Sequence, residues 1–377
     1  MKIDVKIIIL AITAFIGITV TANAQTKIEI GLAGDAYYAT DNDKSVELDE
    51  ERQFTNTNIY RDRFGINNTL LNATVTSDDW RANFAIGTFG DLIQPEEANI
   101  GLRLFEGLWI TGGVFANWDN GYTFEKWFTG NSLTDIRNVG SPYVAWGLEY
   151  AFNEDITLGA GLMNVGFIDI FDYGNNTNVN FETNNNKSIY AILNWNDLYK
   201  DWKFTISLLT GKDGEFPVGK PDGTHDGMPA GITRTTEIYT SLEGTIWGNL
   251  EGQIFGKFFR DDIKDNPEID ALNFITFQTL LRYRFHEKFS AGARFSYLSA
   301  DEPDKSKSSG IDLGIVCEYN PTPFTYLRLE GGMLSLSNSE NNDDAKVFWN
   351  GNENISSRLS IAVSMGFRFS LFEKEIK

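Results

Sequence analysis

The sequence predicts an all-β protein, a transmembrane antiparallel up-and-down β-barrel of about sixteen strands. From Lys27 onward, stretches of roughly ten residues alternate apolar and polar positions, the period of strands with one lipid-facing and one polar face. Short polar turns interleave with connections that are mostly much longer, as in outer-membrane barrels. Aromatic residues gather beside the short turns, where a membrane interface would lie.

The first segment has the three parts of a secretory signal peptide. Two lysines precede an apolar run from Ile7 to Val20, and Ala22-Asn23-Ala24 follows it. A membrane-spanning helix needs about 20 apolar residues, more than this run offers. We therefore expect residues 1–24 to be cleaved and residues 25–377 to form one barrel domain in the outer membrane of a Gram-negative bacterium.

The connections between the expected strands fall into two classes. The short turns are Ser77-Asp78-Asp79, Glu106-Gly107, Asn153-Glu154-Asp155, Asn196-Asp197, Trp247-Gly248-Asn249, His286-Glu287-Lys288 and Asn320-Pro321-Thr322-Pro323. The other connections are 40–63, 91–97, 119–141, 171–187, 210–233, 260–270, 299–310 and 335–356. Strict alternation places all short turns at the periplasmic end and the others outside, which a β-sandwich has no reason to do. Strand counts of fourteen or eighteen remain open.

Aromatic side chains distinguish the same two ends of the expected barrel. The rings within a few residues of a short turn are Trp80, Trp109, Tyr150, Phe152, Trp195, Tyr199, Trp202, Trp247, Phe285, Phe289, Tyr319, Phe324 and Tyr326. A girdle of aromatic residues at the membrane interface would have this placement, although aromatic residues are also common in strands generally.

The last expected strand shows the two faces most plainly. One face carries Leu359, Ile361, Val363, Met365, Phe367, Phe369 and Leu371. The other carries Arg358, Ser360, Ser364, Gly366, Arg368 and Ser370. We expect Phe367 to Phe372 to close the barrel, although the chain continues for five further residues instead of ending on an aromatic residue.

Composition narrows the range of functions. The formal charge is −20, and removal of residues 1–24 deletes two Lys and one Asp, which leaves −21. Such acidity argues against nucleic acid as a partner. Because the chain has a single cysteine, Cys317, it cannot form an internal disulfide. Cys317 follows the apolar phase of its strand, which favours a lipid-facing position.

Enzymatic chemistry finds little support in the residues. The two histidines, His225 and His286, belong to opposite ends of the expected barrel, so they cannot form a shared metal site or serve one nucleophile. The glycines near Lys212 and Lys220 lack the spacing of a phosphate-binding loop. The acidic run at residues 41–51 lacks calcium-loop spacing and is more simply a solvated surface loop. We therefore expect no catalytic residue, no metal and no cofactor.

The stretch "RDRFGINNTLLNATVTSDDWRANFAIGTFGDLIQPEEANIGLRLFEGLWITGGVFANWDNGYTFEKW" resembles outer-membrane β-barrel porins of the OmpL-like kind. The features in common are Trp80-Arg81, Gly87, Glu97-Ala98 and Gly113-Val114-Phe115, and the similarity continues more loosely through "GLEYAFNEDITLGAGLMN" and the final strand. The resemblance implies a porin and brings no catalytic residues.

A porin admits small hydrophilic solutes or ions through a water-filled barrel, and barrels of about sixteen strands are wide enough. Its partners would be outer-membrane lipid, these solutes and further copies of the chain, for example in a trimer. The alternatives are a substrate-selective outer-membrane transporter and a surface adhesin or structural barrel whose long loops carry the function. Conductance in a planar bilayer would separate a channel from an electrically silent adhesin.

The connection between the fifth and sixth expected strands is the candidate constriction. It resembles the loop that sixteen-stranded porins fold into the lumen, and its acidic residues are Asp119, Glu125 and Asp135. The polar phase of the strands places basic residues opposite: Arg81, Arg103, Arg282, Arg284, Arg294, Arg328 and Arg368. Opposed charges would set up a transverse field across a narrow eyelet. The alternative is that these arginines are solvated and paired with Glu149, Glu243, Glu318 and Glu330 while the loop lies outside.

Overall fold

A computed structural model gives the fold of the chain. It describes residues 26–41, 63–89, 92–115, 143–164, 188–211, 232–263, 271–301, 308–338 and 357–376. The expected leader, residues 1–24, and most of the predicted long connections lie outside the described residues.

The described residues form sixteen strands and the short turns between them. The strands are β1 (Thr26–Asp41), β2 (Arg63–Ser77), β3 (Trp80–Phe89), β4 (Leu92–Phe105), β5 (Leu108–Phe115), β6 (Tyr143–Ala151), β7 (Ile156–Asn164), β8 (Ser188–Trp195), β9 (Lys203–Gly211), β10 (Ile232–Trp247), β11 (Leu250–Ile263), β12 (Ala271–His286), β13 (Phe289–Asp301), β14 (Ser308–Thr322), β15 (Thr325–Asn338) and β16 (Ser357–Ile376). Among them no helix is long and apolar enough to cross a membrane.

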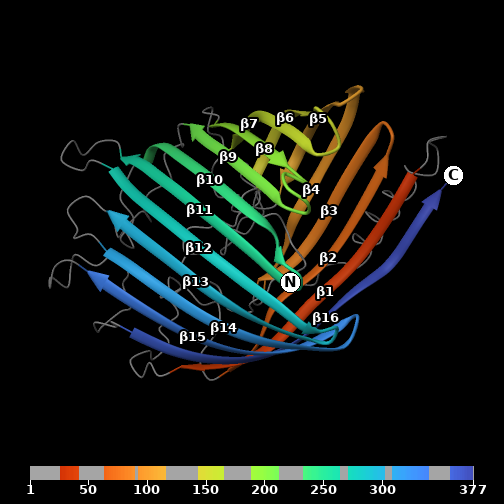
Figure 1. The fold of residues 1–377 in the computed structure, drawn as a ribbon. Coiled ribbons are helices and arrows are strands. Elements are labelled where there is room, and N and C mark those ends of the chain that lie inside the picture. The colour runs from red at the N-terminus through yellow and green to blue at the C-terminus, as the bar shows by residue number, and fades with distance from the viewer. Residues whose placement is uncertain are drawn as a thin grey trace, which may run out of the picture.

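The strands close into one antiparallel barrel (Figure 1). Every strand pairs with its neighbours in sequence, and β1 pairs with β16 along a register that includes Tyr38 opposite Val363. Closure satisfies the backbone hydrogen bonds of both terminal strands and leaves no open edge. The predicted fold class and the count of sixteen strands are confirmed.

Side chains alternate between the two faces of the wall as the sequence predicts. On β16, Ile361, Val363 and Met365 are at least half exposed, whereas Ala362 and Ser364 between them are buried. On this strand small and polar residues point into the barrel and large apolar residues cover its outside. On β11 and β12 the inward face also carries large aromatic side chains, among them Phe255, Phe259 and Phe274.

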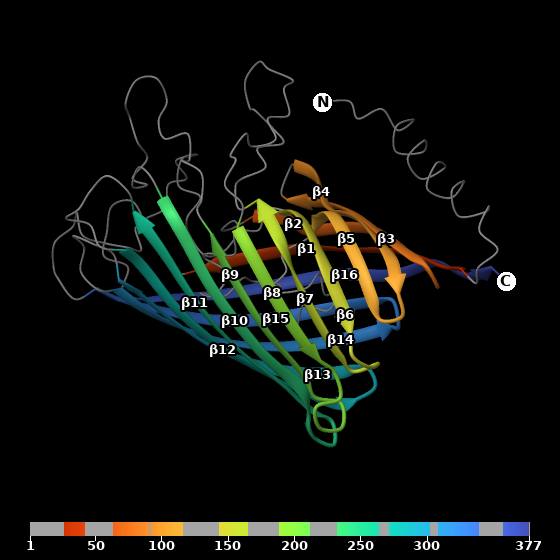
Figure 2. The ribbon, with the colours of Figure 1, turned by 90° about the horizontal axis from the view of Figure 1, so that it is seen from above.

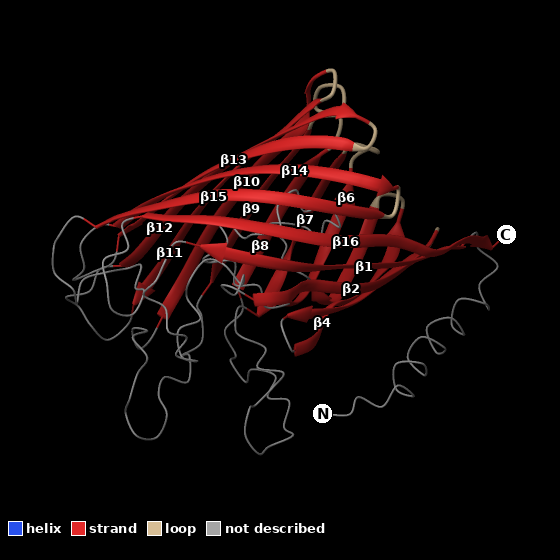
Figure 3. Ribbon diagram, turned by 90° about the horizontal axis from the view of Figure 1, so that it is seen from below, coloured by secondary structure: helices blue, strands red, loops and turns tan. Residues whose placement is uncertain are grey.

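The described turns gather at one end of the barrel, which we call the turn end (Figure 3). Their sequences fit tight reversals. Gly107 and Gly248 have positive φ angles of 78° and 55°, which a glycine adopts without strain. In the β6–β7 turn, the Asn153 side chain accepts hydrogen bonds from the backbone N–H groups of Asp155 at 2.9 Å and Ile156 at 2.7 Å.

The strands are longer than the sequence pattern predicts at several ends, and one predicted loop is wrong. Residues 92–97 belong to β4 and not to a connection. The register between β3 and β4 shifts beside Pro95, which pairs with Ile86. A proline at a bulge interrupts the two-residue alternation, so this part of β4 has the appearance of a loop in the sequence. The last strand also continues past Phe372, and Glu375 pairs with Lys27.

The aromatic girdle is present at the turn end, but not every predicted ring belongs to it. Tyr199, Trp247 and Phe285 are among the exposed rings. Two others serve the inside of the wall. The guanidinium of Arg81 lies over the Trp109 ring, 4.9 Å from its centroid, and the guanidinium of Arg328 lies over the Tyr326 ring, 4.2 Å from its centroid.

Candidate functional site: the inner wall of the barrel

The inner wall is the surface that any solute inside the barrel would meet. Its residues are those that alternate with the exposed apolar side chains, and they include many charged and hydrogen-bonding groups. Strand pairing fixes which of these groups are neighbours, because side chains at paired positions lie on the same face.

Arg81 on β3 and Glu149 on β6 form one corner of this surface. The Arg81 Nη2 atom lies 2.8 Å from Glu149 Oε2, and both side chains are about 30% exposed. Trp109 pairs directly with Glu149 and lies beneath the Arg81 guanidinium. The stacked ring and the carboxylate together hold this arginine in one position on the wall.

Beside this corner two paired inward positions of the wall are glycines. Gly147 and Gly161 face inward at paired positions of β6 and β7, and the ring of Tyr190 on β8 occupies the space that a Cβ atom at either glycine would need. The Tyr190 hydroxyl reaches Thr111 on β5, with which it forms a side-chain hydrogen bond. The tyrosine therefore lies along the wall across two strands, which glycine at both positions permits.

A carboxylate with amide neighbours lies on the same side of the barrel. Asn99 Nδ2 donates a hydrogen bond of 2.6 Å to Glu97 Oε1, and Asn83 Nδ2 donates one of 3.2 Å to Asn99 Oδ1. These groups present both donors and acceptors toward the lumen.

The wall of β10–β14 carries ion pairs that are much more deeply buried. Lys257 Nζ lies 3.1 Å from Glu237 Oε1, and the two side chains are 7% and 4% exposed. Arg294 Nη2 lies 3.0 Å from Asp312 Oδ2, with both side chains 9% exposed. Between these two pairs, Ser296 donates a hydrogen bond of 3.1 Å to Gln278.

Arginines gather near the turn end of the same wall, where two carboxylates neutralise part of their charge. Arg282 and Arg284 both contact Glu251, at 2.5 Å and 3.1 Å. Arg328 pairs with Glu318 and also lies over the ring of Tyr326, 4.2 Å from its centroid.

Arg368 approaches the same Tyr326 ring, 4.9 Å from the centroid. Asn320 donates a hydrogen bond of 3.1 Å to Glu318. The two arginines, one ring and one carboxylate form a compact group on β14, β15 and β16.

The seven arginines predicted for the lumen all lie on described strands. Arg81 pairs with Glu149 and Arg328 pairs with Glu318, and both carboxylates are among the four that the sequence offered as partners of these arginines. Carboxylates also contact Arg282, Arg284 and Arg294. Arg103 differs in position, since it binds Asp79 in the β2–β3 turn at 2.7 Å and therefore lies at the rim. The three loop acids, Asp119, Glu125 and Asp135, lie outside the described residues.

Several partners were missed from the sequence. Glu251 and Asp312 neutralise arginines, and Glu237 neutralises Lys257. The position of Glu251 directly opposite Arg282 depends on the register across the connection from β11 to β12, which alternation alone does not fix. Glu243, which the sequence offered to arginine, contacts Lys203 and Gln253 instead.

The described residues contain no metal-ligating cluster. None of their His, Cys, Asp and Glu side chains gather in a set of three or more that could hold a metal ion. His286 lies in the β12–β13 turn, where its Nδ1 atom accepts a hydrogen bond of 3.2 Å from the Lys288 N–H group. His225 lies outside the described part of the chain.

No protein-family model matches the sequence, and no curated protein matches it either. Solved structures do match the fold. OmpT of Vibrio cholerae in its trimer form aligns with a TM-score of 0.61 at 12% identity, over 91% of this chain and 99% of that one. An anion-selective porin from Comamonas acidovorans aligns with a TM-score of 0.59 at 13% identity, over 91% of this chain and 100% of that one.

The outer-membrane channel DcaP of Acinetobacter baumannii aligns with a TM-score of 0.57 at 10% identity, over 93% of this chain and 98% of that one. At such low identity the likeness concerns the fold and not the solute, the selectivity or the OmpL-like family. The chain therefore has the closed barrel fold of outer-membrane porins and channels.

Proposed function

We propose that this protein is an outer-membrane porin through which small hydrophilic solutes or ions diffuse. The observation that carries the proposal is the two-faced wall, whose inner side holds the partly exposed ion pairs Arg81–Glu149 and Lys203–Glu243 while its outer side is apolar. Charged groups on the inside of a wide barrel favour a water-filled lumen, and an apolar outside favours a bilayer.

The inner wall suits passage rather than tight capture. Cations and anions lie beside one another in the accessible pairs Arg81–Glu149 and Lys203–Glu243, so a passing solute can form hydrogen bonds there without a strong net attraction to either charge. Pairing on the wall holds each guanidinium in position and reduces its long-range field.

Single-channel recording from the purified protein in a planar bilayer tests the proposal. We expect stepwise currents whose conductance increases with the KCl concentration, as in an open aqueous pore. A preparation that is folded by circular dichroism but electrically silent would contradict the porin assignment and favour the surface adhesin or structural barrel.

The constriction is a finer part of the same proposal. We place it in the connection between β5 and β6, with Asp119, Glu125 and Asp135 opposite the arginines of the wall. Deletion of residues 122–137 should then raise the single-channel conductance and change the reversal potential in a KCl gradient. Deletion of residues 214–229 from the connection between β9 and β10 removes the same length of chain and is the matched control. Equal effects of the two deletions would exclude the β5–β6 connection as the constriction.

We propose a weak preference for cations. The mature charge of −21 attracts them toward the mouth, while paired charges leave the wall itself close to neutral. Because salt screens such fields over about 10 Å at 0.1 M, the reversal potential should shrink toward zero as the KCl concentration rises. A preference that persists at 1 M KCl would instead point to a local binding site in the lumen.

Processing, location and assembly follow from the same proposal. We expect cleavage after Ala24, so N-terminal sequencing should recover Gln25 from protein that fractionates with the outer membrane. A homotrimer is the assembly we propose, supported by the trimer form of the V. cholerae neighbour. We also propose that the protein has no catalytic activity and that it is related to porins of the OmpL-like kind.

A further inference from the structure

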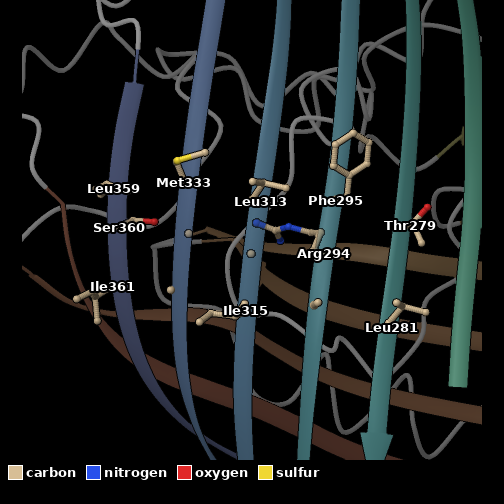
Figure 4. Close-up of a pocket in the computed structure, with 14 residues that line it drawn as sticks. Thr279, Leu281, Arg294, Phe295, Leu313, Ile315, Met333, Leu359, Ser360 and Ile361 are labelled. Carbon is tan, nitrogen blue, oxygen red and sulfur yellow. The ribbon is translucent and has the colours of Figure 1, made fainter. Parts of the chain in front are cut away.

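The outer surface of the barrel has a hollow over β12–β16 (Figure 4). Its volume is about 660 Å³. Leu281, Phe295, Leu313, Met333 and Ile361 are among the side chains that line it. These are the alternating outward positions of five neighbouring strands, so the hollow opens away from the lumen.

Small side chains in one row create the hollow. Strand pairing aligns Leu281, Ala293, Ile315, Gly331 and Ile361 across the five strands. Ala293 and Gly331 leave gaps on either side of Ile315, and a Cβ atom added at Gly331 would meet only the Ile315 side chain, at 3.5 Å. The row is therefore lower than the adjoining row that contains Phe295, because two of its five positions have little or no side chain.

The adjoining row toward the other end of the barrel is bulky. It consists of Thr279, Phe295, Leu313, Met333 and Leu359, and four of these five side chains are large and apolar. The hollow thus has a raised edge on this side, and its floor has small residues at two of five positions, Ala293 and Gly331.

The chemistry of the lining selects the occupant. Arg294 lies among the lining residues, but its guanidinium binds Asp312 on the inner face, so no charged group is available to a ligand outside. Five strands spaced by about 4.8 Å give the hollow a length of roughly 19 Å, which suits an extended apolar chain better than a compact headgroup. The hollow is also continuous with the apolar outer surface that faces a bilayer in the proposed function.

We propose that this hollow holds one acyl chain of a glycerophospholipid. The proposal rests on the placement of the barrel in a bilayer. There, acyl chains are the surrounding solvent, and a chain that fills the hollow restores the van der Waals contacts that Ala293 and Gly331 leave unmade. Such a lipid should exchange more slowly than lipid against the smooth parts of the wall.

The chain supplies its own reporter beside the hollow. Cys317 is the only cysteine, it is exposed, and it pairs with Ala291 and Leu329 in the row next to Ile315. A bimane fluorophore attached there can be quenched by bromine atoms on the acyl chains of phosphatidylcholine.

The experiment titrates brominated phosphatidylcholine into detergent-solubilised, bimane-labelled protein. We expect quenching that saturates near one lipid per barrel. Gly331→Leu fills the floor of the hollow and should raise the lipid concentration needed for half-quenching at least tenfold. Gly256→Leu is the matched control, since Gly256 also faces outward and a Cβ there meets nothing closer than 3.6 Å. It should leave the titration unchanged.

Identical titrations for wild type and Gly331→Leu, or quenching that never saturates, would overturn the acyl-chain site. Reconstitution into vesicles of brominated lipid tests separately whether the barrel lies in a bilayer. Bimane is attached at Cys317 in one sample. In a second sample it is attached at position 254, on the outward face of β11, in the double variant Cys317→Ser, Ile254→Cys. If neither position is quenched there, the membrane placement itself fails. If only position 254 is quenched, another copy of the chain covers the hollow, and the lipid proposal is again wrong.

Discussion

Buried charges on the inner wall depend on partners from neighbouring strands. A lysine or carboxylate that is removed from water loses several kcal/mol of hydration, and only a close counter-ion offsets the loss. Lys257 and Glu237 meet this condition across the β10–β11 pairing, with less than a tenth of either side chain exposed. Lys203 and Glu243 lie 4.0 Å apart and are roughly half exposed, so water still solvates each of them.

This contrast predicts different costs for the same substitution. Lys257→Met removes the counter-ion that lies 3.1 Å from the buried carboxylate of Glu237 and should lower the free energy of unfolding by about 3–5 kcal/mol. Lys203→Met should cost less than about 1 kcal/mol, because that pair is exposed. Urea titration of the refolded barrels in vesicles measures both values. Adding Glu237→Gln to Lys257→Met should restore most of the loss, and a double variant as unstable as the single one would contradict the pairing argument.

Adjacent residues on β16 test which face meets lipid. Ile361 is 57% exposed on the outside, while Ser360 belongs to the inward phase. Ile361→Arg places a charge in the apolar band and should cost roughly 2–4 kcal/mol near the midplane. Ser360→Arg should cost much less, since its side chain can reach lumen water. Equal losses of unfolding free energy for the two variants would mean that the proposed lipid and lumen faces are wrong.

At the scale of elements, the sequence predicted the strands and short turns well because two-residue alternation and turn residues are local signals. The beginning of β4 was missed because Pro95 at a bulge disturbs that alternation. The short turn between β14 and β15 fixes the register of these two strands, so the pairing of Glu318 with Arg328 can be predicted by counting residues from the turn. The pairing of Glu251 with Arg282 cannot be predicted in this way, because their strands are joined by a longer connection, whose length does not fix the register.

The β8–β9 turn is attached to the neighbouring hairpin by contacts that the sequence did not reveal. Asp201 accepts hydrogen bonds from both the hydroxyl and the backbone N–H of Thr245, and Trp202 lies against Gly244. The hydrogen bond from Thr245 lowers the pKa of Asp201 below its usual value of 3.8. This turn lies at the end of the barrel, beyond the strands that would cross the bilayer.

The direction of the pKa shift sets the pH dependence of this contact. A lowered folded-state pKa contributes stability that is present above pH 3.8 and is lost as the pH falls through the folded-state pKa. We expect the Thr245 amide to exchange several-fold faster in Asp201→Ala than in wild type at pH 6, and the difference to vanish at strongly acidic pH. Glu154→Ala, in the β6–β7 turn, is the control and should leave this amide unchanged. A difference that is the same at every pH would exclude the ionised carboxylate as the cause.

At the scale of the whole molecule, the separation of two kinds of connection gives the barrel a direction. The described turns lie together at one end (Figure 2), and every pair of strands that they join is adjacent in the barrel. In outer-membrane barrels the short turns face the periplasm. The formal charge of −20 adds a reason to expect this orientation, since long polar connections placed at the cell surface would keep their charge in water.

An epitope inserted at each end tests this orientation. A tag between Asp222 and Gly223, in the connection between β9 and β10, should bind antibody on intact cells. The same tag between Glu154 and Asp155, in the β6–β7 turn, should bind only after the outer membrane is permeabilised, because short turns face the periplasm. Permeabilised cells serve as the control that both tags are present and both barrels are made. If intact cells were labelled only through the tag at Glu154, the barrel would have the opposite orientation, and the proposed constriction would lie on the periplasmic side.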